Sequence, residues 1–400
     1  MSASWHGDAE HYSILYGRGN YYWIAYMDCM QHVFKEDQAS NGLVRELFQL
    51  INALKDIGKN VSDYASPDLV DINEDSGIRV LCDNIETSTL DLVREGRSGS
   101  SERLWGIDSQ SRVLGLEGVD VHIVAAALVG GRQVLVPGLQ GVKWLGLKFR
   151  YIPSDTDELA RHYGNYIYVK SRHVNRFFDG RFNDEAIREE IRSHVESSLL
   201  EAAPSNAFVL LDGPLFSTSA ALGMDNDYSR LYYSLIEERV RAMNGKNVIG
   251  IVKRISHSKY LAKCLNLDID DESIARRQAD NMGGSSNGGR IAYKVGPITI
   301  ETTDGKYSKT AWYLVVPMGK FRHVVRVESL NAELLDDKIG VVASMIDPTG
   351  TAVPISIADR LSRRLSSAAM HLIGNLSPLN PTYDGLRELE NSIRDIGVIP

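Results

Sequence analysis

The sequence predicts an α/β fold in which a mixed sheet is flanked by helices and preceded by an N-terminal helical extension. Apolar residues recur at helical spacing up to about residue 75, and short apolar runs typical of strands dominate from about residue 103. Amphipathic helical segments alternate with these runs further along the chain. With 400 residues, 43% of them hydrophobic and 24% charged, the chain has the composition of a soluble globular protein with an ample core.

The first part of the chain has a helical pattern. Leu43, Leu47 and Leu50 recur at helical spacing, and Pro67 with the acidic run after it marks a boundary. We therefore expect an N-terminal helical region over residues 1–96, followed by a core over residues 97–400.

Two strands open the predicted core. Residues 104–108 form a short apolar strand that ends in Asp108, and residues 119–128 form a longer strand that stops at Gly130. The stretch around 131–183 is mixed, with a hairpin-like alternation over 166–169. We treat this stretch as an insertion in the core.

The clearest helix covers residues 184–203. Asp184 is the expected N-cap, and Ile187, Ile191 and Val195 begin the buried stripe. The later elements follow from the same two periodicities. They are strands over 207–211, 247–252, 291–300, 311–317 and 323–330, and helices over about 226–243, around Tyr260 and over about 356–373. The sequence MGGSSNGG at 282–289 is typical of a flexible loop.

Charge and apolar patterning argue against several classes of protein. The net charge of −8 and the pI near 5.7 are unlike those of a protein that coats nucleic acid by its own electrostatics. They leave room for an enzyme that receives its substrate from a partner. No apolar run is long enough for a membrane span, and the first residues lack the pattern of a secretory signal.

The cysteine pattern predicts a reduced protein. Cys29, Cys82 and Cys264 are far apart in the sequence, odd in number and without a CxxC pair. This pattern is typical of a cytoplasmic protein with free thiols, and it excludes a zinc site built from cysteines.

Two predicted strands end in an aspartate. The run FVLL leads into Asp212, and LWGI leads into Asp108. Turn chemistry accounts for Asp212-Gly213-Pro214 on its own, because Asp, Gly and Pro are the usual turn residues. A buried carboxylate is nevertheless costly unless it is paired, and carboxylates that converge from several strands are typical of divalent-metal sites. The sequence leaves both interpretations open for Asp212.

Two further groups could contribute to chemistry. Glu196 lies three and four residues from Leu199 and Leu200, so it borders the apolar face of the 184–203 helix, where an edge glutamate in solvent is the alternative. A basic cluster follows the 247–252 strand, and it can hold a phosphate or simply form a solvated loop. Its members are Lys253, Arg254, His257 and Lys259. No Walker A loop or zinc-binding histidine pair is present.

The order of these motifs resembles the NurA nuclease family. The matching stretches are LWGIDSQS with Asp108, IRSHVESSLLEA with Glu196, FVLLDGPLFS with Asp212, IGIVKRISHSKYL with Lys253, and HVVRVESL with Arg326 and Glu328. They occur in the family's order over roughly residues 103–370. The specificity of the resemblance comes from this order and from the strand context of each motif.

The resemblance implies a ribonuclease H-like fold and a metal-dependent DNA nuclease. It implies Mn²⁺ as cofactor, with Mg²⁺ possible, 5′-3′ exonuclease and single-strand endonuclease activity, and a homodimer docked on a HerA-type hexameric ATPase in DNA end processing or antiviral defence. Asp108, Glu196 and Asp212 are the expected catalytic metal ligands. Lys253 is the expected catalytic lysine, and with Arg254, His257 and Lys259 it is expected to contact DNA.

The chain departs from the family at three places. Asp108-Ser109-Gln110 and Asp212-Gly213-Pro214 replace Asp-Gly-Ser turns, and VPISIADRLSRR places Asp359 where the family tends to carry a histidine. Aspartate also binds hard cations, so Asp359 is the expected fourth ligand. The altered turns favour an alternative function, a catalytically weak adaptor that caps a HerA-type motor. A nuclease acting on RNA or a hybrid is a third possibility.

Overall fold

The computed structural model describes residues 77–396, except for 83, 99–103, most of 151–166, 220–221, 223–225, 284–290, 319–320, 348 and 378. The helical pattern predicted before residue 76, Cys29, and most of the predicted loop at 282–289 lie outside the described residues. The described residues belong to one compact unit, Ser66–Pro400.

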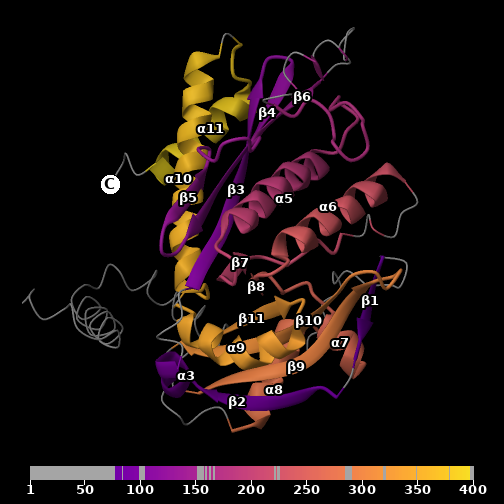
Figure 1. The fold of residues 1–400 in the computed structure, drawn as a ribbon, viewed down its shortest axis with the longest axis vertical. Helices are drawn as coiled ribbons and strands as arrows, with labels where there is room; N and C mark the ends of the chain where they lie inside the picture. Colours follow the sequence, from indigo (N-terminus) through magenta and orange to yellow (C-terminus); the bar gives the residue numbers. More distant parts are fainter. Residues whose placement is uncertain are drawn as a thin grey trace, which may run out of the picture. The chain divides into compact units, whose positions relative to one another are not determined.

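An 11-stranded sheet forms the centre of the described part (Figure 1). Its main order is β1-β9-β10-β11-β8-β7-β3-β4-β5, with β2 paired to β9 and β6 paired to β4. The strands are β1 (Ile78–Leu81), β2 (Glu86–Asp91), β3 (Leu104–Leu116), β4 (Val119–Val129), β5 (Gln133–Val136), β6 (Leu145–Phe149), β7 (Phe208–Asp212), β8 (Asn247–Val252), β9 (Ile291–Thr302), β10 (Ser308–Met318) and β11 (Phe321–Ser329).

Five adjacent strands carry the predicted fold. In the order β5-β4-β3-β7-β8, the strands β3, β4 and β5 pair antiparallel, whereas β7 runs parallel to β3 and β8 runs parallel to β7. This is the strand order of a ribonuclease H-like sheet, so the predicted fold class is confirmed. The antiparallel strands β9, β10 and β11 extend the sheet beyond β8.

Helices cover both faces of the sheet, as Figure 1 shows for α5 and α6 on one side of β3 and α10 on the other. The helices are α3 (Leu92–Ser98), α5 (Asp184–Ala202), α6 (Asp227–Met243), α7 (Tyr260–Leu265), α8 (Asp271–Asn281), α9 (Ala332–Met345), α10 (Val353–Leu376) and α11 (Tyr383–Ile396). The apolar cores assign α5 to α8 to one face, and α9 and α10 to the other. Along β10, Tyr313 and Val315 face the first set, whereas Leu314 and Val316 face the second, as strand alternation requires.

Most elements predicted after residue 183 are confirmed, but several expectations along the chain are wrong. The predicted short strand at 104–108 is in fact the first part of β3, so Asp108-Ser109-Gln110 is extended chain and not a turn. Asn183, not Asp184, caps α5, because its side chain accepts hydrogen bonds from the Glu185 and Ala186 amides.

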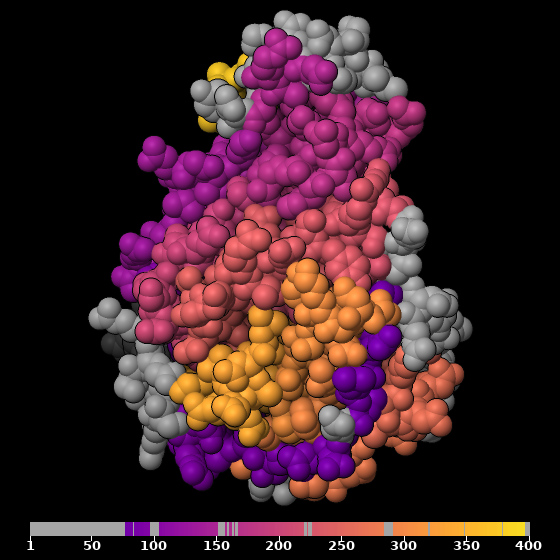
Figure 2. Space-filling model, turned by 45° about the vertical axis from the view of Figure 1, so that its right-hand side comes forward, coloured from indigo at the N-terminus to yellow at the C-terminus, as the bar shows by residue number. Residues whose placement is uncertain are grey.

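The end of the predicted N-terminal helical region is also wrong. Residues 78–81 and 86–91 form β1 and β2, both paired antiparallel with β9, so the sheet begins before residue 97. The indigo segment along the border of the orange region in Figure 2 is this part of the chain. The stretch predicted as an insertion contributes β5 and β6. In its hairpin-like segment, Tyr168 forms an isolated bridge with Gly146, and the next residue but one, Lys170, forms another with Phe177.

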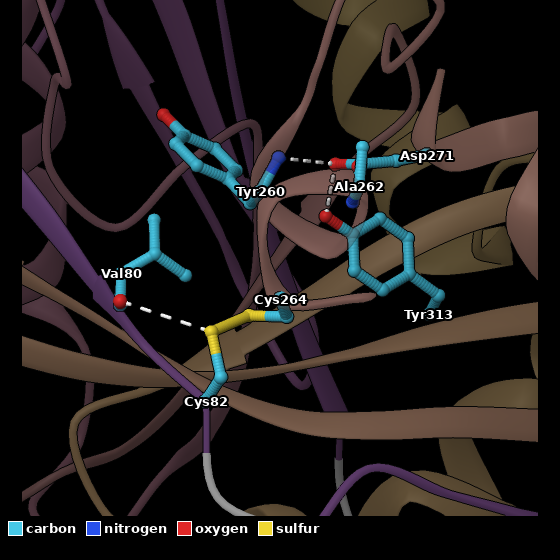
Figure 3. Close-up of a disulfide and its surroundings, with 7 residues drawn as sticks. All are labelled: Val80, Cys82, Tyr260, Ala262, Cys264, Asp271 and Tyr313. Carbon is cyan, nitrogen blue, oxygen red and sulfur yellow. Dashed lines mark hydrogen bonds between the residues drawn. A yellow bond between two sulfur atoms is a disulfide. The ribbon is translucent and has the colours of Figure 1, made fainter. Parts of the chain in front are cut away.

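The expectation of reduced cysteines is wrong for two of the three. Cys82, after β1, and Cys264, in α7, form a disulfide (Figure 3). They are 182 residues apart in the sequence, and the fold brings them together because α7 packs against β1 and β9. The cysteine pattern therefore no longer supports a reducing compartment. Among the described residues, no helix combines the length and apolar character that a membrane span requires.

Candidate active site

Asp108 and Asp212 occupy matching positions on neighbouring parallel strands. The pairing of β3 with β7 runs from Leu104 opposite Phe208 to Ile107 opposite Leu211, and the two aspartates come next in register. Alternation along each strand directs both carboxylates to the face covered by α9 and α10. The sheet thus brings together the two aspartates that the sequence singled out.

Asp108 is almost fully buried beside other carboxylates. Only 3% of its surface is exposed, and the Ser362 hydroxyl of α10 donates a hydrogen bond to its Oδ2 at 2.7 Å. Burial, and then the nearby Asp212 carboxylate, raise the pKa of Asp108 to about 8, and Asp359 adds to this effect. At neutral pH, a carboxyl group with this pKa is largely protonated unless a cation replaces the proton.

One carboxylate oxygen of Asp212 has an ion-pair partner, and the other has no hydrogen-bond partner. Its Oδ2 receives a 2.8 Å ion pair from the Lys253 ammonium, which follows β8. Its Oδ1 is buried and has no hydrogen-bond partner among the described residues. A buried acceptor without a donor is unfavourable, so this oxygen is available either to the proton of a protonated Asp108 or to a cation that replaces that proton.

Asp359 enters from α10. The Ser362 hydroxyl that bonds Asp108 also lies 3.0 Å from the Asp359 carbonyl oxygen, so Asp359 is in the turn of α10 next to Asp108. The Asp359 Oδ1 accepts a 2.8 Å bond from Arg363, one helical turn further on. Asp108, Asp212 and Lys253 therefore come together, and the turn of α10 that carries Asp359 borders them.

Glu196 lies apart, on α5 at the opposite face of β3. Its carboxylate accepts hydrogen bonds from the Ser109 hydroxyl, from Arg192 at 2.9 Å and from Arg239 at 2.6 Å. Burial alone would raise the pKa of Glu196, but the two arginines outweigh it and lower the pKa to about 2. This carboxylate is thus ionised and already held by cations. Beside it, a cavity of about 330 Å³ opens between α5, α6 and the segment 214–219.

The basic cluster does not converge as a whole. Lys253 reaches Asp212, whereas Lys259 forms a 2.9 Å ion pair with Asp268. Arg254 and His257 are exposed on the turn between β8 and α7. Only Lys253 of this group is placed at the two aspartates.

Comparison with protein families gives one match over most of the core. The NurA domain model matches residues 102–364, which include every candidate site residue. The chain belongs to the NurA family.

Solved NurA structures are similar to this chain at low identity. The NurA nuclease from Sulfolobus solfataricus is 13% identical, with 84% of this chain and 99% of that chain covered and a TM-score of 0.39. A second NurA structure is 10% identical, with 72% and 90% covered and a TM-score of 0.42. A NurA structure described as bound to dAMP and manganese is 10% identical, with 67% and 88% covered and a TM-score of 0.38. The search of curated protein sequences returned no match.

The site of this NurA-family chain fits a cation that takes few protein ligands. Within the described ranges, no three His, Cys, Asp or Glu side chains are grouped closely enough to hold a metal ion together. Mg²⁺ in phosphoryl-transfer sites is usually bound by one or two carboxylates together with water and substrate phosphates. The Asp108 and Asp212 carboxylates meet that requirement, and the free Asp212 Oδ1 supplies the ligand atom.

Several polar residues around this site were not predicted from the sequence. Arg192 lies four residues before Glu196, so helical spacing could have indicated their pairing. Ser362 and Arg239 come from distant helices, and no local pattern marks them. Arg326 and Glu328 belong to the quoted RVE motif, but the pattern did not reveal that they form a buried ion cluster with Lys309.

Proposed function

We propose that this NurA-family chain is a divalent-cation-dependent deoxyribonuclease that hydrolyses phosphodiester bonds. The observation that carries the proposal is the pair of the buried Asp108 and the half-buried Asp212, aligned on adjacent parallel strands, with one buried oxygen of Asp212 left without a donor. Two carboxylates buried side by side repel each other, and a divalent cation removes that cost. Hard oxygen ligands suit Mn²⁺ or Mg²⁺.

The proposed roles divide between two groups of residues. Asp108 and Asp212 hold the cation, and Asp359 is a peripheral ligand that also orients water. Glu196, expected from the sequence as a further ligand, is not assigned to the cation, because it lies on the opposite face of β3 and is already held by Arg192 and Arg239. When bound, the cation lowers the pKa of an attacking water and offsets charge on the phosphate.

The basic residues are proposed to contact the nucleic acid. Lys253 neutralises Asp212 at Oδ2 while leaving Oδ1 open, and its ammonium can also meet a phosphate oxygen. Arg254, His257 and Lys259 follow on the same turn and track the backbone. Contacts of this kind carry no base specificity, so the proposed substrate is DNA without sequence preference.

The finer assignments rest on the family. We extend to this chain 5′-3′ exonuclease and single-strand endonuclease action, a homodimer, and a HerA-type hexameric ATPase as partner in end processing or antiviral defence. The net charge of −8 supports a partner, because the chain on its own attracts DNA poorly.

The test is cleavage of labelled single- and double-stranded DNA with Mn²⁺, Mg²⁺ or chelator. We expect cation-dependent cutting, and we expect Asp212→Asn to lower it about a hundredfold or more, because loss of a cation ligand removes several kcal/mol of transition-state stabilisation. The variant should keep its fold and any contact with the motor. Cutting at the wild-type rate by Asp212→Asn would show that the site is assigned wrongly.

A second candidate is a catalytically weak adaptor that caps a HerA-type motor. The arginine pairs that close around Glu196 favour it, because this carboxylate is not free to bind a cation. Calorimetric titration with Mn²⁺ separates the two functions. A nuclease binds the cation through Asp108 and Asp212, whereas an adaptor gives no binding heat and no cutting even with the motor added.

A further inference from the structure

We propose that Lys309, Arg326 and Glu328 are positioning residues, which hold in place the two chain segments that follow Asp212 and Lys253. The inference rests on the proposed function and extends it to three residues that do not touch the cation or the DNA. They lie on β10 and β11, and their side chains project from the face of the sheet opposite to the one that carries the Asp212 and Lys253 side chains.

The three side chains form a buried ion cluster. Their exposed fractions are 1% for Lys309, 4% for Arg326 and 0% for Glu328. Glu328 receives Lys309 Nζ at 2.8 Å on one oxygen and Arg326 Nε at 2.9 Å on the other. Removing three charges from water is costly, and an apolar cluster of similar volume would often be at least as stable. Stability alone therefore gives little reason for this arrangement.

The first arm of the cluster holds the segment after Asp212. The Leu215 amide donates to Glu328 Oε2 at 3.1 Å, and Lys309 Nζ donates to the Phe216 carbonyl at 3.1 Å. Glu328 is opposite Gly250 in the β11–β8 register. A Cβ on Gly250 would lie 2.8 Å from the Gly213 carbonyl oxygen, so the absence of a side chain there lets the segment approach.

The second arm holds the turn after Lys253. Arg326 is opposite Val252, the last residue of β8, and its Nη1 donates to the Ser258 hydroxyl at 3.1 Å. Its guanidinium also lies 4.8 Å from the centre of the Tyr260 ring. Ser258 in turn donates to Asp271.

Asp271 extends this arm into the start of α7. Its carboxylate accepts the Tyr260 and Ala262 amides at 3.0 Å each and the Tyr313 hydroxyl (Figure 3). These bonds satisfy amides in the first turn of α7, which lack partners within the helix. The turn that begins at Lys253 is thus fixed at its far end.

Both sets of contacts include the Glu328 carboxylate, which therefore couples the two segments that follow Asp212 and Lys253. A displacement of about 1 Å at a reacting centre can cost about a hundredfold in rate, even when its origin is remote. The cluster acts on the geometry of Asp212 and Lys253, and its loss therefore lowers kcat while KM for DNA changes little.

The experiment compares two variants with opposite effects. Lys309→Met with Glu328→Leu replaces an ion pair by apolar side chains and removes both contacts to residues 215 and 216. Arg326 remains as one buried cation without a carboxylate, so we expect the unfolding midpoint to fall, but less than in a variant that leaves two such cations. We expect kcat with Mn²⁺ to fall about a hundredfold. Amide hydrogen exchange at Leu215 should become faster.

Glu328→Gln is the conservative partner variant. Its amide oxygen still accepts the Leu215 amide, but it leaves two buried cations without a carboxylate. We expect it to unfold at lower temperature than the double variant and yet to retain a kcat within a few-fold of the wild-type value at temperatures where it is folded. If the cluster had only a structural role, Glu328→Gln, the less stable of the two variants, would also have the lower kcat.

Arg112→Met is the matched control. Arg112 is a buried cation on β3 that pairs with Glu388 and Asp395 of α11 and does not contact either held segment. It should lower the unfolding midpoint without a selective loss of kcat. If the double variant keeps the wild-type kcat, or if kcat follows stability in all three variants, the inference is overturned. If the wild-type chain does not cut DNA with any cation, the proposed function has failed, and the inference falls with it.

Discussion

At the scale of single residues, the ionisation of Asp108 affects both the stability of the fold and the proposed binding of a cation. Its carboxyl group would ionise near pH 3.8 in the unfolded chain, whereas burial and the neighbouring Asp212 raise its pKa to about 8 in the folded chain. Between these two pH values the folded state holds a proton that the unfolded state has lost. The free energy of unfolding of the cation-free protein therefore decreases as the pH rises from about 4 to about 8.

Asp108→Asn should remove this dependence, because the amide does not ionise. We expect the variant to be more stable than the wild type at pH 8 in chelator, with a smaller difference at pH 5. Thermal unfolding at both pH values measures it. Adding Mn²⁺ at pH 8 should stabilise the wild type more than the variant, since a ligand stabilises only the state that binds it. Equal pH slopes for the two proteins would contradict the assignment.

Residue patterns indicated both aspartates but misplaced the surroundings of one. The polar run Ser109-Gln110-Ser111 looked like a turn, yet it lies inside β3, where Ser109 bonds to Glu196. A polar strand interior becomes acceptable only when another element supplies the partners. Such partners are set by the tertiary fold, which explains why the pairing of Arg239 with Glu196 could not be predicted from local sequence.

At the scale of elements, the close approach of α10 to β3 decides where Asp359 and Ser362 lie. A Cβ on Gly106 would come within 2.4 Å of the Pro354 carbonyl carbon and oxygen, at the start of α10. Backbone atoms cannot give way as a flexible side chain can. Gly106, two residues before Asp108, therefore lets the helix and its polar residues reach the buried carboxylate.

Gly106→Ala should push the start of α10 away from the sheet. We expect a loss of about 1–3 kcal/mol in the free energy of unfolding, as is usual for overpacking, together with reduced cation-dependent cutting. Gly96→Ala in α3 is the control, because its Cβ would meet Ser344 at an ordinary 3.6 Å. Urea unfolding and the cleavage assay measure both variants. A Gly106→Ala protein as stable and active as the control would show that α10 need not pack this closely.

Most elements with a strong hydrophobic period were predicted, and most elements without one were not. The strands β8 to β11 and the helices α5, α6 and α10 were expected from alternation or from an apolar stripe. The helix α8 was missed because most of its residues are polar. The helices α9 and α11 were also missed, although each has apolar residues at helical spacing. The short strands β1 and β2 depend on pairing with β9, a partner some 200 residues away in the sequence, so no local pattern marks them.

At the scale of the whole molecule, the disulfide ties one edge of the sheet to α7. It links residues 182 positions apart and so restricts the unfolded chain over a long loop. Cys82→Ser should lower the free energy of unfolding by about 2–5 kcal/mol. Denaturant unfolding with and without a reductant measures this difference.

The reductant supplies the control for this prediction. It should destabilise the wild type by the same amount and leave Cys82→Ser with Cys264→Ser unchanged. A wild-type protein that is insensitive to reductant would show that the two cysteines are not bonded in solution.

The same bond makes a closed covalent ring of residues 82–264. Asp108, Glu196, Asp212 and Lys253 all lie on that ring, whereas Asp359 lies on the tail outside it. One protease cut anywhere between the two cysteines therefore opens the ring without releasing a fragment. Such a nicked protein migrates as a single chain on a denaturing gel until a reductant is added, and only then separates into two pieces.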